Sequence, residues 1–413
     1  MEKEQNVMNV ANDIGYGYTK AKLDGEQVKI PSVIARLQPQ NINAPLAFGS
    51  QQEQDDYFAN FLDHLDISIS SSEVRDSGRF LVGPAAVNSQ LPLTSFDVND
   101  FGGKSEDDLS LILSLSLIAG KRVADAYRAG EPLTEPLQVT VNMATALPVT
   151  EGKRKGVEDA YVARYKNQKH TVTFHNFKDP ITVTIQFNEV YVGLEGEVAL
   201  FYLRYSSKEV REKLFSQFKA DYPEIAAQVN PNMLVKVTEL LGVDIGDGST
   251  DINIFSNGKA NAAVSSSLLK GYGNTLNEAI RVLQAEQMNF ESRAQLQDYL
   301  TQEVTPFAKA HQQRVQQVVY NQLNPFADQI LQEVSNVMRQ GGTKVALAYV
   351  FGGGAVPMHD HSYLPEKLAE KLKRFNGGDP IPVIWLPADL TQIINELALD
   401  FVLHQFAKQS KSK

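Results

Sequence analysis

A glycine-rich phrase occurs twice in this chain, and its two copies lie 231 residues apart. The first copy, D-I-G-Y-G-Y-T, covers residues 13–19, and the second copy, D-I-G-D-G-S-T, covers residues 244–250. Five of the seven positions are identical. A repeat over so long a distance is typical of a chain that builds two domains of similar fold.

Each copy has the flanks of a β-hairpin. An apolar run precedes it, at residues 7–11 and 240–243, and alternating residues follow it. Asp24-Gly25 and Asn257-Gly258 then supply the residues typical of a two-residue hairpin turn. One isolated G-x-G would most simply mark a bulge or a bend. Two equivalent hairpins instead favour two domains that face each other across a cleft.

The residues of this phrase suit a nucleotide. Glycines let a backbone approach a ligand closely, exposed amides and a Ser or Thr hydroxyl donate to oxyanions, and a carboxylate can hold a hydrated cation. We therefore expect ATP or GTP together with Mg²⁺. The chain has no G-x-x-x-x-G-K-[ST] loop, no kinase motif set and no G-x-G-x-x-G at the start of a helix, so the cleft is of another kind.

A third glycine cluster follows a continuous apolar run. Residues 345–351 read V-A-L-A-Y-V-F, as in a buried strand, and Gly352-Gly353-Gly354 comes directly after them. Alone, this pattern indicates a strand-to-helix turn. A bare backbone at such a turn could also lie against a flat base or ribose.

These three motifs, in this order, resemble those of the actin-like ATPase superfamily. They match its first phosphate motif at 13–20, its second at 244–251 and its adenosine motif at 350–357. The phrase D-I-G-Y-G-Y-T-K is similar to the first motif of the ParM branch, as are V-G-P-A-A at 82–86 and T-A-L-P-V at 145–149. The resemblance implies an α/β fold of the actin-like, ribonuclease H-like duplicated type, with two similar domains flanking a nucleotide cleft.

The resemblance also implies roles for individual residues. Asp13 and Asp244 would hold the metal, Mg²⁺, through waters, and Lys20 is a cation that the second copy replaces by Asp251. For Glu278 and Arg281 a plain surface role is the alternative. The implied nucleotide-binding residues are Asp13, Gly15, Tyr16, Gly17, Thr19, Lys20, Asp244, Gly246, Asp247, Gly248, Ser249, Thr250, Asp251, Gly271, Glu278, Arg281, Gly352, Gly353 and Gly354.

The family carries its catalytic glutamate after a hairpin, which here corresponds to the alternating run 171–192. The phrase Y-V-G-L-E-G-E-V-A then offers Glu195 and Glu197. The family pattern P-E-x-x-x-A, aligned on Ala199, selects Glu195 as the residue that orients water. Leu194 stands where the family has proline, so Glu197 remains an alternative.

The resemblance also suggests how the chain is divided. Local patterns add a buried helix at 107–127, a helical stretch at 290–340 interrupted by Pro306 and Pro325, and an amphipathic helix at 388–406. The expected domain I covers 1–230, with a small subdomain at about 36–80, and is completed by a C-terminal helix at 389–413. The expected domain II covers 231–388, with a small subdomain at about 275–340.

Composition limits the partners. The net charge is −10, which argues against direct DNA binding, because neutralising phosphates requires a concentrated Lys/Arg surface. The chain has no cysteine and no apolar run of about 20 residues, and residues 1–10 contain no leader pattern. We expect a cytoplasmic protein that does not bind a membrane.

The ParM resemblance implies a nucleoside triphosphatase, an ATPase or GTPase, that polymerises into dynamic filaments. Such filaments segregate plasmid DNA through a DNA-binding adaptor protein, so the expected partners are other copies of the chain and that adaptor. A non-polymerising sugar or acetate kinase of the same fold is the main alternative. A heat-shock chaperone is disfavoured because the chain ends soon after the last motif. A membrane-bound cell-shape protein is disfavoured because residues 1–10 lack an amphipathic stripe.

Overall fold

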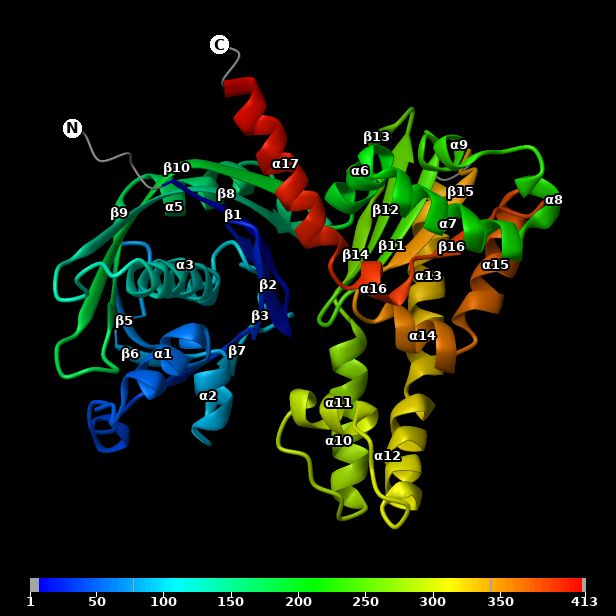
Figure 1. Ribbon diagram of the computed structural model, residues 1–413. Helices are drawn as coiled ribbons and strands as arrows, with labels where there is room; N and C mark the ends of the chain where they lie inside the picture. Colours follow the sequence, from blue (N-terminus) through cyan, green and yellow to red (C-terminus); the bar gives the residue numbers. More distant parts are fainter. Residues whose placement is uncertain (1–6, 77, 342–343, 411–413) are drawn as a thin grey trace. The chain divides into compact units, whose positions relative to one another are not determined.

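The computed structural model describes residues 7–76, 78–341 and 344–410 (Figure 1). These form two compact units. Unit 1 comprises the described residues of 1–147, 154–194 and 396–413, and unit 2 comprises those of 148–153 and 195–395. Residues 1–6, part of the segment without a leader pattern, lie outside the described residues.

Unit 1 is built on one mixed sheet of ten strands, in the order β3-β2-β1-β8-β10-β9-β5-β6-β4-β7. The predicted hairpin at 171–192 is confirmed as the antiparallel pair of β9 and β10. The strands are β1 (Val7–Ile14), β2 (Tyr18–Leu23), β3 (Glu26–Pro31), β4 (Val33–Arg36), β5 (Asp66–Ser70), β6 (Arg79–Val82), β7 (Leu93–Ser95), β8 (Leu137–Leu147), β9 (Lys169–Phe174) and β10 (Ile181–Leu194).

The core of unit 1 forms around the helix α3 (Asp108–Arg128), which lies inside the curve of this sheet (Figure 1). Asp107 caps its first turn by accepting a hydrogen bond from Leu109 N. Most of α3 is buried, which confirms the buried helix predicted at 107–127. The shorter helices of unit 1 are η1 (Pro39–Asn41), α1 (Gln51–Ala59), η2 (Phe61–Asp63), α2 (Pro84–Asn88) and α5 (Val157–Lys166).

Unit 2 has a smaller sheet in the order β13-β12-β11-β15-β16, with β14 paired to β12. Strands β11, β15 and β16 run parallel, and every residue of β11 and β15 is buried, as a strand covered on both faces requires. The strands are β11 (Leu240–Ile245), β12 (Thr250–Ser256), β13 (Lys259–Ala260), β14 (Ser266–Leu268), β15 (Leu347–Phe351) and β16 (Val383–Trp385).

Four helices follow the second hairpin, and two prolines separate the last three. Pro306 lies between two helices, and Pro325 lies in the first turn of a third, so the predicted interruptions are confirmed. Val315, Val319 and Ile330 are buried, as the predicted core stripe requires. These helices are α10 (Tyr272–Ala285), α11 (Arg293–Thr301), α12 (Lys309–Asn321) and α13 (Leu323–Gly341).

The tight turns predicted after the two glycine phrases are confirmed. Asp24 and Gly25 have φ values of +47° and +90°, and Asn257 and Gly258 have values of +53° and +71°. Positive φ at both central residues defines the turn whose twist matches that of a hairpin. These turns connect β2 to β3 in unit 1 and β12 to β13 in unit 2.

The boundary between the two domains differs from the expected one at residue 230, because four helices before that residue or next to it belong to unit 2. Leu200 fills the space beside Gly242, where a β-carbon would lie 2.5 Å from its side chain. The Tyr349 hydroxyl donates to Leu234 O at 3.3 Å. These helices therefore cover the second sheet. They are α6 (Glu197–Tyr205), α7 (Lys208–Asp221), α8 (Pro223–Ala226) and α9 (Pro231–Val235).

The single helix predicted at 388–406 is wrong. The segment instead forms the short helix α16 (Ala388–Thr391) and the longer α17 (Ile394–Ser410). Thr391 O accepts a hydrogen bond from Gly352 N at 3.3 Å rather than from the next helical turn. Contact with the triple-glycine turn therefore replaces the helical bond at the break. The remaining helices of unit 2 are α4 (Val149–Gly152), α14 (Ala355–His361) and α15 (Leu364–Phe375).

A helix that crosses a membrane must be long and apolar. None of those within residues 7–76, 78–341 and 344–410 is long and apolar enough to cross a membrane.

Candidate functional site

The two glycine phrases form the same local structure, one in each unit. In the first hairpin Gly15 N donates to Tyr18 O at 3.1 Å, and in the second Gly246 N donates to Ser249 O at 2.9 Å. A β-carbon on Gly15 or Gly246 would meet that carbonyl oxygen at 2.7 or 2.9 Å. Only glycine fits such a close approach, so the repeated sequence encodes a repeated bend.

The two equivalent threonines stabilise these bends internally. Ser32 Oγ donates to Gly15 O at 2.7 Å, so the hydrogen between Thr19 Oγ1 and Ser32 Oγ, 2.9 Å apart, comes from Thr19. In the second hairpin Thr250 Oγ1 donates to Lys270 O at 2.9 Å. Both hydroxyl hydrogens are thus used within the fold. The threonines therefore hold the bends in place.

Asp13 and Lys20 lie opposite each other in the first hairpin. Asp13 is 8% exposed, and Glu396 of α17 lies close enough for the two carboxylates to interact. Burial raises the pKa of Glu396, a hydrogen bond from Gln27 at 2.9 Å opposes that shift, and the charge of Asp13 adds to it. Two acidic groups, one from β1 and one from α17, therefore interact near the first bend.

Tyr16, at the tip of the first bend, turns its ring into the protein. The ring is 7% exposed and packs edge-on against Phe96, with centroids 5.8 Å apart. The ammonium of Lys104 lies over the same ring, 4.4 Å from its centroid. The side chain of Tyr16 is therefore part of the packing, and its backbone is the part that shapes the bend.

Asp251 is held differently from Lys20, its counterpart in the first hairpin. It is 2% exposed and accepts hydrogen bonds from Val149 N at 3.2 Å, from Ser249 Oγ at 3.4 Å and from Ser267 Oγ. Val149 belongs to α4, which unit 2 includes although the neighbouring residues belong to unit 1. Asp251 thus anchors that segment to the second hairpin.

Asp247 and the start of α10 form one side of the second bend. Tyr272 N donates to Gly246 O at 2.9 Å, and Gly273 N donates to Asp247 O at 2.8 Å. The Asp247 carboxylate forms an ion pair with Arg293 of α11. Because Gly271 precedes this helix, its backbone can pass directly beside the bend; a β-carbon there would lie 2.5 Å from Asp247 O.

The triple-glycine turn packs against the second hairpin. Gly354 N donates to Ile245 O at 2.8 Å, and Gly352, with φ of +94°, lies next to the Asp244 side chain. Asn395 Nδ2 donates to Asp244 Oδ2 at 2.9 Å, while Asn395 Oδ1 is buried with no hydrogen-bond partner among the described residues. Unit 2 therefore brings together the second and third motifs, and Asn395 contacts the first residue of the second motif.

The two candidate catalytic glutamates differ in environment. Glu195 lies between β10 and α6 and is 8% exposed, whereas Glu197 is half-buried in the first turn of α6. Gly196, between them, has φ of +73° and passes beside Asn253. Glu195 is therefore the more buried of the two candidates.

The last two expected contacts lie on α10. Glu278 of α10 forms an ion pair with Lys270 at 3.0 Å, and Arg281 is exposed. Within the part of the chain that the structure describes, no three acidic or histidine side chains form a ready metal cluster.

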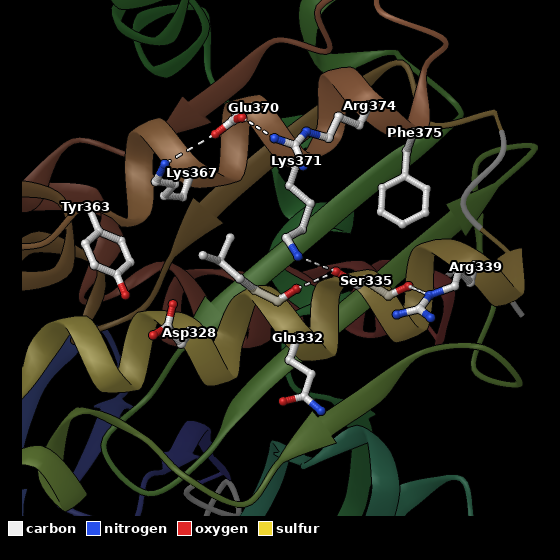
Figure 2. A pocket seen from close by; sticks show the side chains of 11 residues that line it. Asp328, Gln332, Ser335, Arg339, Tyr363, Lys367, Glu370, Lys371, Arg374 and Phe375 are labelled. Carbon is white, nitrogen blue, oxygen red and sulfur yellow. Dashed lines mark hydrogen bonds and ion pairs between the residues drawn. The ribbon is translucent and has the colours of Figure 1, made fainter.

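A groove of about 830 Å³ lies elsewhere in unit 2, between α13 and α15 (Figure 2). Lys371 reaches across it and donates to Ser335 Oγ at 2.8 Å, while Glu370 pairs with Lys367 and Arg374 along one edge. None of the motif residues lines this groove. This groove is therefore separate from the motif residues of unit 2.

Comparison with known proteins identifies the family. Residues 11–197 match the N-terminal domain of actin-like proteins, and residues 242–362 match the C-terminal domain of archaeal MreB-like actin homologues. The chain belongs to the actin-like superfamily. By sequence, no curated protein matches it.

Solved structures share this actin-like fold at low identity. The actin-like protein Alp7A has a TM-score of 0.64 and 16% identity, with 99% of each chain covered. Bacillus thuringiensis ParM with ATP has a TM-score of 0.58 and 16% identity over 97% of this chain and 100% of its own. A non-polymerisable quadruple mutant of pCBH ParM has a TM-score of 0.56 and 15% identity over 98% and 100%. The predicted α/β actin-like fold is confirmed.

Several residues of this actin-like protein were not found by sequence reasoning. Ser32, Lys104 and Arg293 contact the bends from other parts of the chain, and no spacing rule connects them to a glycine phrase. Asn395 lies in the segment predicted as an amphipathic helix, and that pattern gave no contact with the second bend. Its bond to Asp244 became visible only in the fold.

Proposed function

We propose that this actin-like protein is a nucleoside triphosphatase that polymerises with ATP or GTP and Mg²⁺ and serves plasmid segregation. The observation that carries the proposal is the pair of equivalent glycine bends, one in each unit, with the triple-glycine turn packed against the second. Family membership and the likeness to ParM and Alp7A structures support it.

The proposed chemistry is phosphoryl transfer to water. That reaction depends mainly on positioning the attacking water in line and on neutralising charge, with little covalent work by the protein. The backbone amides of the bends would bind phosphate oxygens, and Lys20 would add a positive charge at the first bend. Asp13 and Asp244 would hold Mg²⁺ through its waters, and bound Mg²⁺ would neutralise phosphate charge.

In this proposal Glu195 orients the water. Its burial directly after β10 would limit its motion. Glu197, two residues further on, is the matched control because it has the same charge and lies in the same segment. Hydrolysis would destabilise the polymer, and a separate DNA-binding adaptor would link it to DNA, since the net charge of −10 disfavours direct contact.

The test is sedimentation of purified protein with Mg²⁺ and ATP, GTP, ADP or no nucleotide, with phosphate release measured in the same samples. We expect pelleting that depends on the nucleoside triphosphate. Glu195→Ala should reduce phosphate release by about 100-fold or more and prolong pelleting, while Glu197→Ala should behave like the wild type. Equal loss in both variants would contradict the assignment to Glu195.

A second outcome of the same experiment would contradict the proposed polymerisation. If the protein binds nucleotide but never pellets across salt and protein concentrations, polymerisation is wrong. A phosphotransferase of the sugar or acetate kinase type then becomes the better hypothesis, and phosphate transfer to those acceptors should be measured directly.

A further inference from the structure

The buried ammonium beside the first bend has no role in the proposed mechanism. Lys104 is 2% exposed, and its nitrogen lies 4.4 Å from the centroid of the Tyr16 ring. Removing an ammonium from water is costly unless other groups stabilise it, and the face of an aromatic ring is one such group. The Tyr16 ring is therefore one of the groups that stabilise this ammonium in its buried position.

The segment that carries Lys104 is fixed in place by two arginines of unit 1. Arg154 donates to Phe101 O at 2.8 Å and to Gly102 O at 3.1 Å. Arg164 donates to Ser105 O at 2.6 Å. The backbone on both sides of Lys104 is thus held, and Ser110 Oγ donates to Lys104 O at 2.7 Å.

Tyr16 connects this segment to the bend. Its ring contacts Lys104 and Phe96, which both lie in the segment between β7 and α3. Its backbone lies between Gly15 and Gly17. The position of the ring constrains the backbone to which it is attached. Any shift of Lys104 therefore acts on the peptide groups of the bend.

We propose that Lys104 is a positioning residue for phosphate binding: by packing on Tyr16 it holds the first bend in its phosphate-binding shape and adds positive potential there. This inference rests on the proposed function, because it takes the bend to bind nucleotide phosphates. Coupling of this kind is reciprocal. If buried Lys104 favours phosphate binding, bound phosphate must favour buried Lys104 by the same free energy.

The chain offers a matched control in the same hairpin. Lys29 lies over the Tyr18 ring at the same nitrogen-to-centroid distance, 4.4 Å, but it is exposed. Tyr18 is two residues from Tyr16 and faces a different environment. A general effect of removing a lysine from a tyrosine ring would therefore appear equally in Lys29→Met and Lys104→Met.

The first experiment is titration calorimetry of the full chain with Mg-ATP, Mg-GTP, AMP and GMP. We expect Lys104→Met to weaken binding of the preferred triphosphate about tenfold and to change monophosphate binding less than about twofold. Lys29→Met should bind like the wild type, and Lys104→Arg should recover most of the loss. Equal losses for triphosphate and monophosphate would indicate a merely structural residue and overturn the proposal.

The second experiment uses the wild-type protein, so it remains informative if Lys104→Met does not fold. Lysines are acetylated at a low reagent concentration and the rate at each site is read by mass spectrometry. Nucleoside triphosphate should slow acetylation of Lys104 but not of Lys29. If the protein binds triphosphate but Lys104 is acetylated at the same rate with and without it, the inference is overturned and the proposed function stands. A wild type that binds neither ATP nor GTP would overturn both.

Discussion

The triple-glycine turn supports a quantitative prediction, because its first two glycines have opposite surroundings. Gly352 has φ of +94°, and a β-carbon there would lie 2.5 Å from Ile245 O and 2.3 Å from Asp244 Oδ1. For Gly353 no atom lies within 4 Å of the corresponding position. Gly352→Ala should therefore be strongly destabilising, and Gly353→Ala should not.

The magnitude follows from two contributions. Placing a β-carbon in the left-handed region costs about 1–2 kcal/mol, and forcing an extra carbon into packed surroundings costs about 1–3 kcal/mol. The sum for Gly352→Ala is about 2–5 kcal/mol of the free energy of unfolding. Gly353→Ala should change it by less than about 1 kcal/mol and in the stabilising direction, since alanine restricts the unfolded chain.

The assay uses the only tryptophan of the chain. Trp385 lies in β16, next to β15, and is 8% exposed, so its fluorescence reports unfolding of unit 2. Urea titration should place the midpoint of Gly352→Ala about 1–2 M below the wild type. If both alanine variants unfold at the wild-type midpoint, the close approach of this turn to Ile245 and Asp244 is wrong.

Two further predictions concern the carboxylates near the bends. Because burial raises the pKa of Glu396, ionisation of this group destabilises the folded protein. Glu396→Gln should therefore raise the unfolding temperature at pH 7. The difference in unfolding temperature between this variant and the wild type should shrink as the pH falls below the ordinary glutamate range. A difference in unfolding temperature that grows on acidification would contradict this pH dependence. Gln27→Ala removes the hydrogen bond to the Glu396 carboxylate and should lower the unfolding temperature at pH 7. Asn395→Asp places a second carboxylate beside Asp244 and should lower the free energy of unfolding of unit 2 by about 1–3 kcal/mol. The tryptophan signal measures this, and a loss absent at high pH but present at low pH would contradict the charge explanation.

Local chemistry explains why so much of the fold could be predicted. A two-residue turn needs positive φ at both centres, and Asp24-Gly25 and Asn257-Gly258 meet that need without help from distant residues. Pro306 lies between two helices because proline cannot continue one. The shape of each glycine bend also depends on nearby residues, since the glycine N–H donates to a carbonyl only three residues away.

The roles of individual side chains were harder to predict, because a side chain acts through partners that sequence spacing does not reveal. Thr19 and Thr250 resemble phosphate ligands in the sequence, yet in the fold their hydroxyl hydrogens go to Ser32 Oγ and Lys270 O. Asp251 lies in the second glycine phrase region, and its hydrogen bond from the backbone of Val149 could not be foreseen from sequence spacing. Polar side chains become structural when a buried donor or acceptor needs them.

By itself, then, the sequence determined the duplicated hairpins, their turns, the helix interruptions at Pro306 and Pro325 and the order of the three motifs, because each depends on backbone preferences within a few residues. The tertiary structure alone decided that α6–α9 cover the second sheet, that the last helix breaks after α16, and that Asn395 and Lys104 reach the bends. These contacts join residues from about 90 to 150 positions apart, and such pairs form only when the packing of whole elements brings them together.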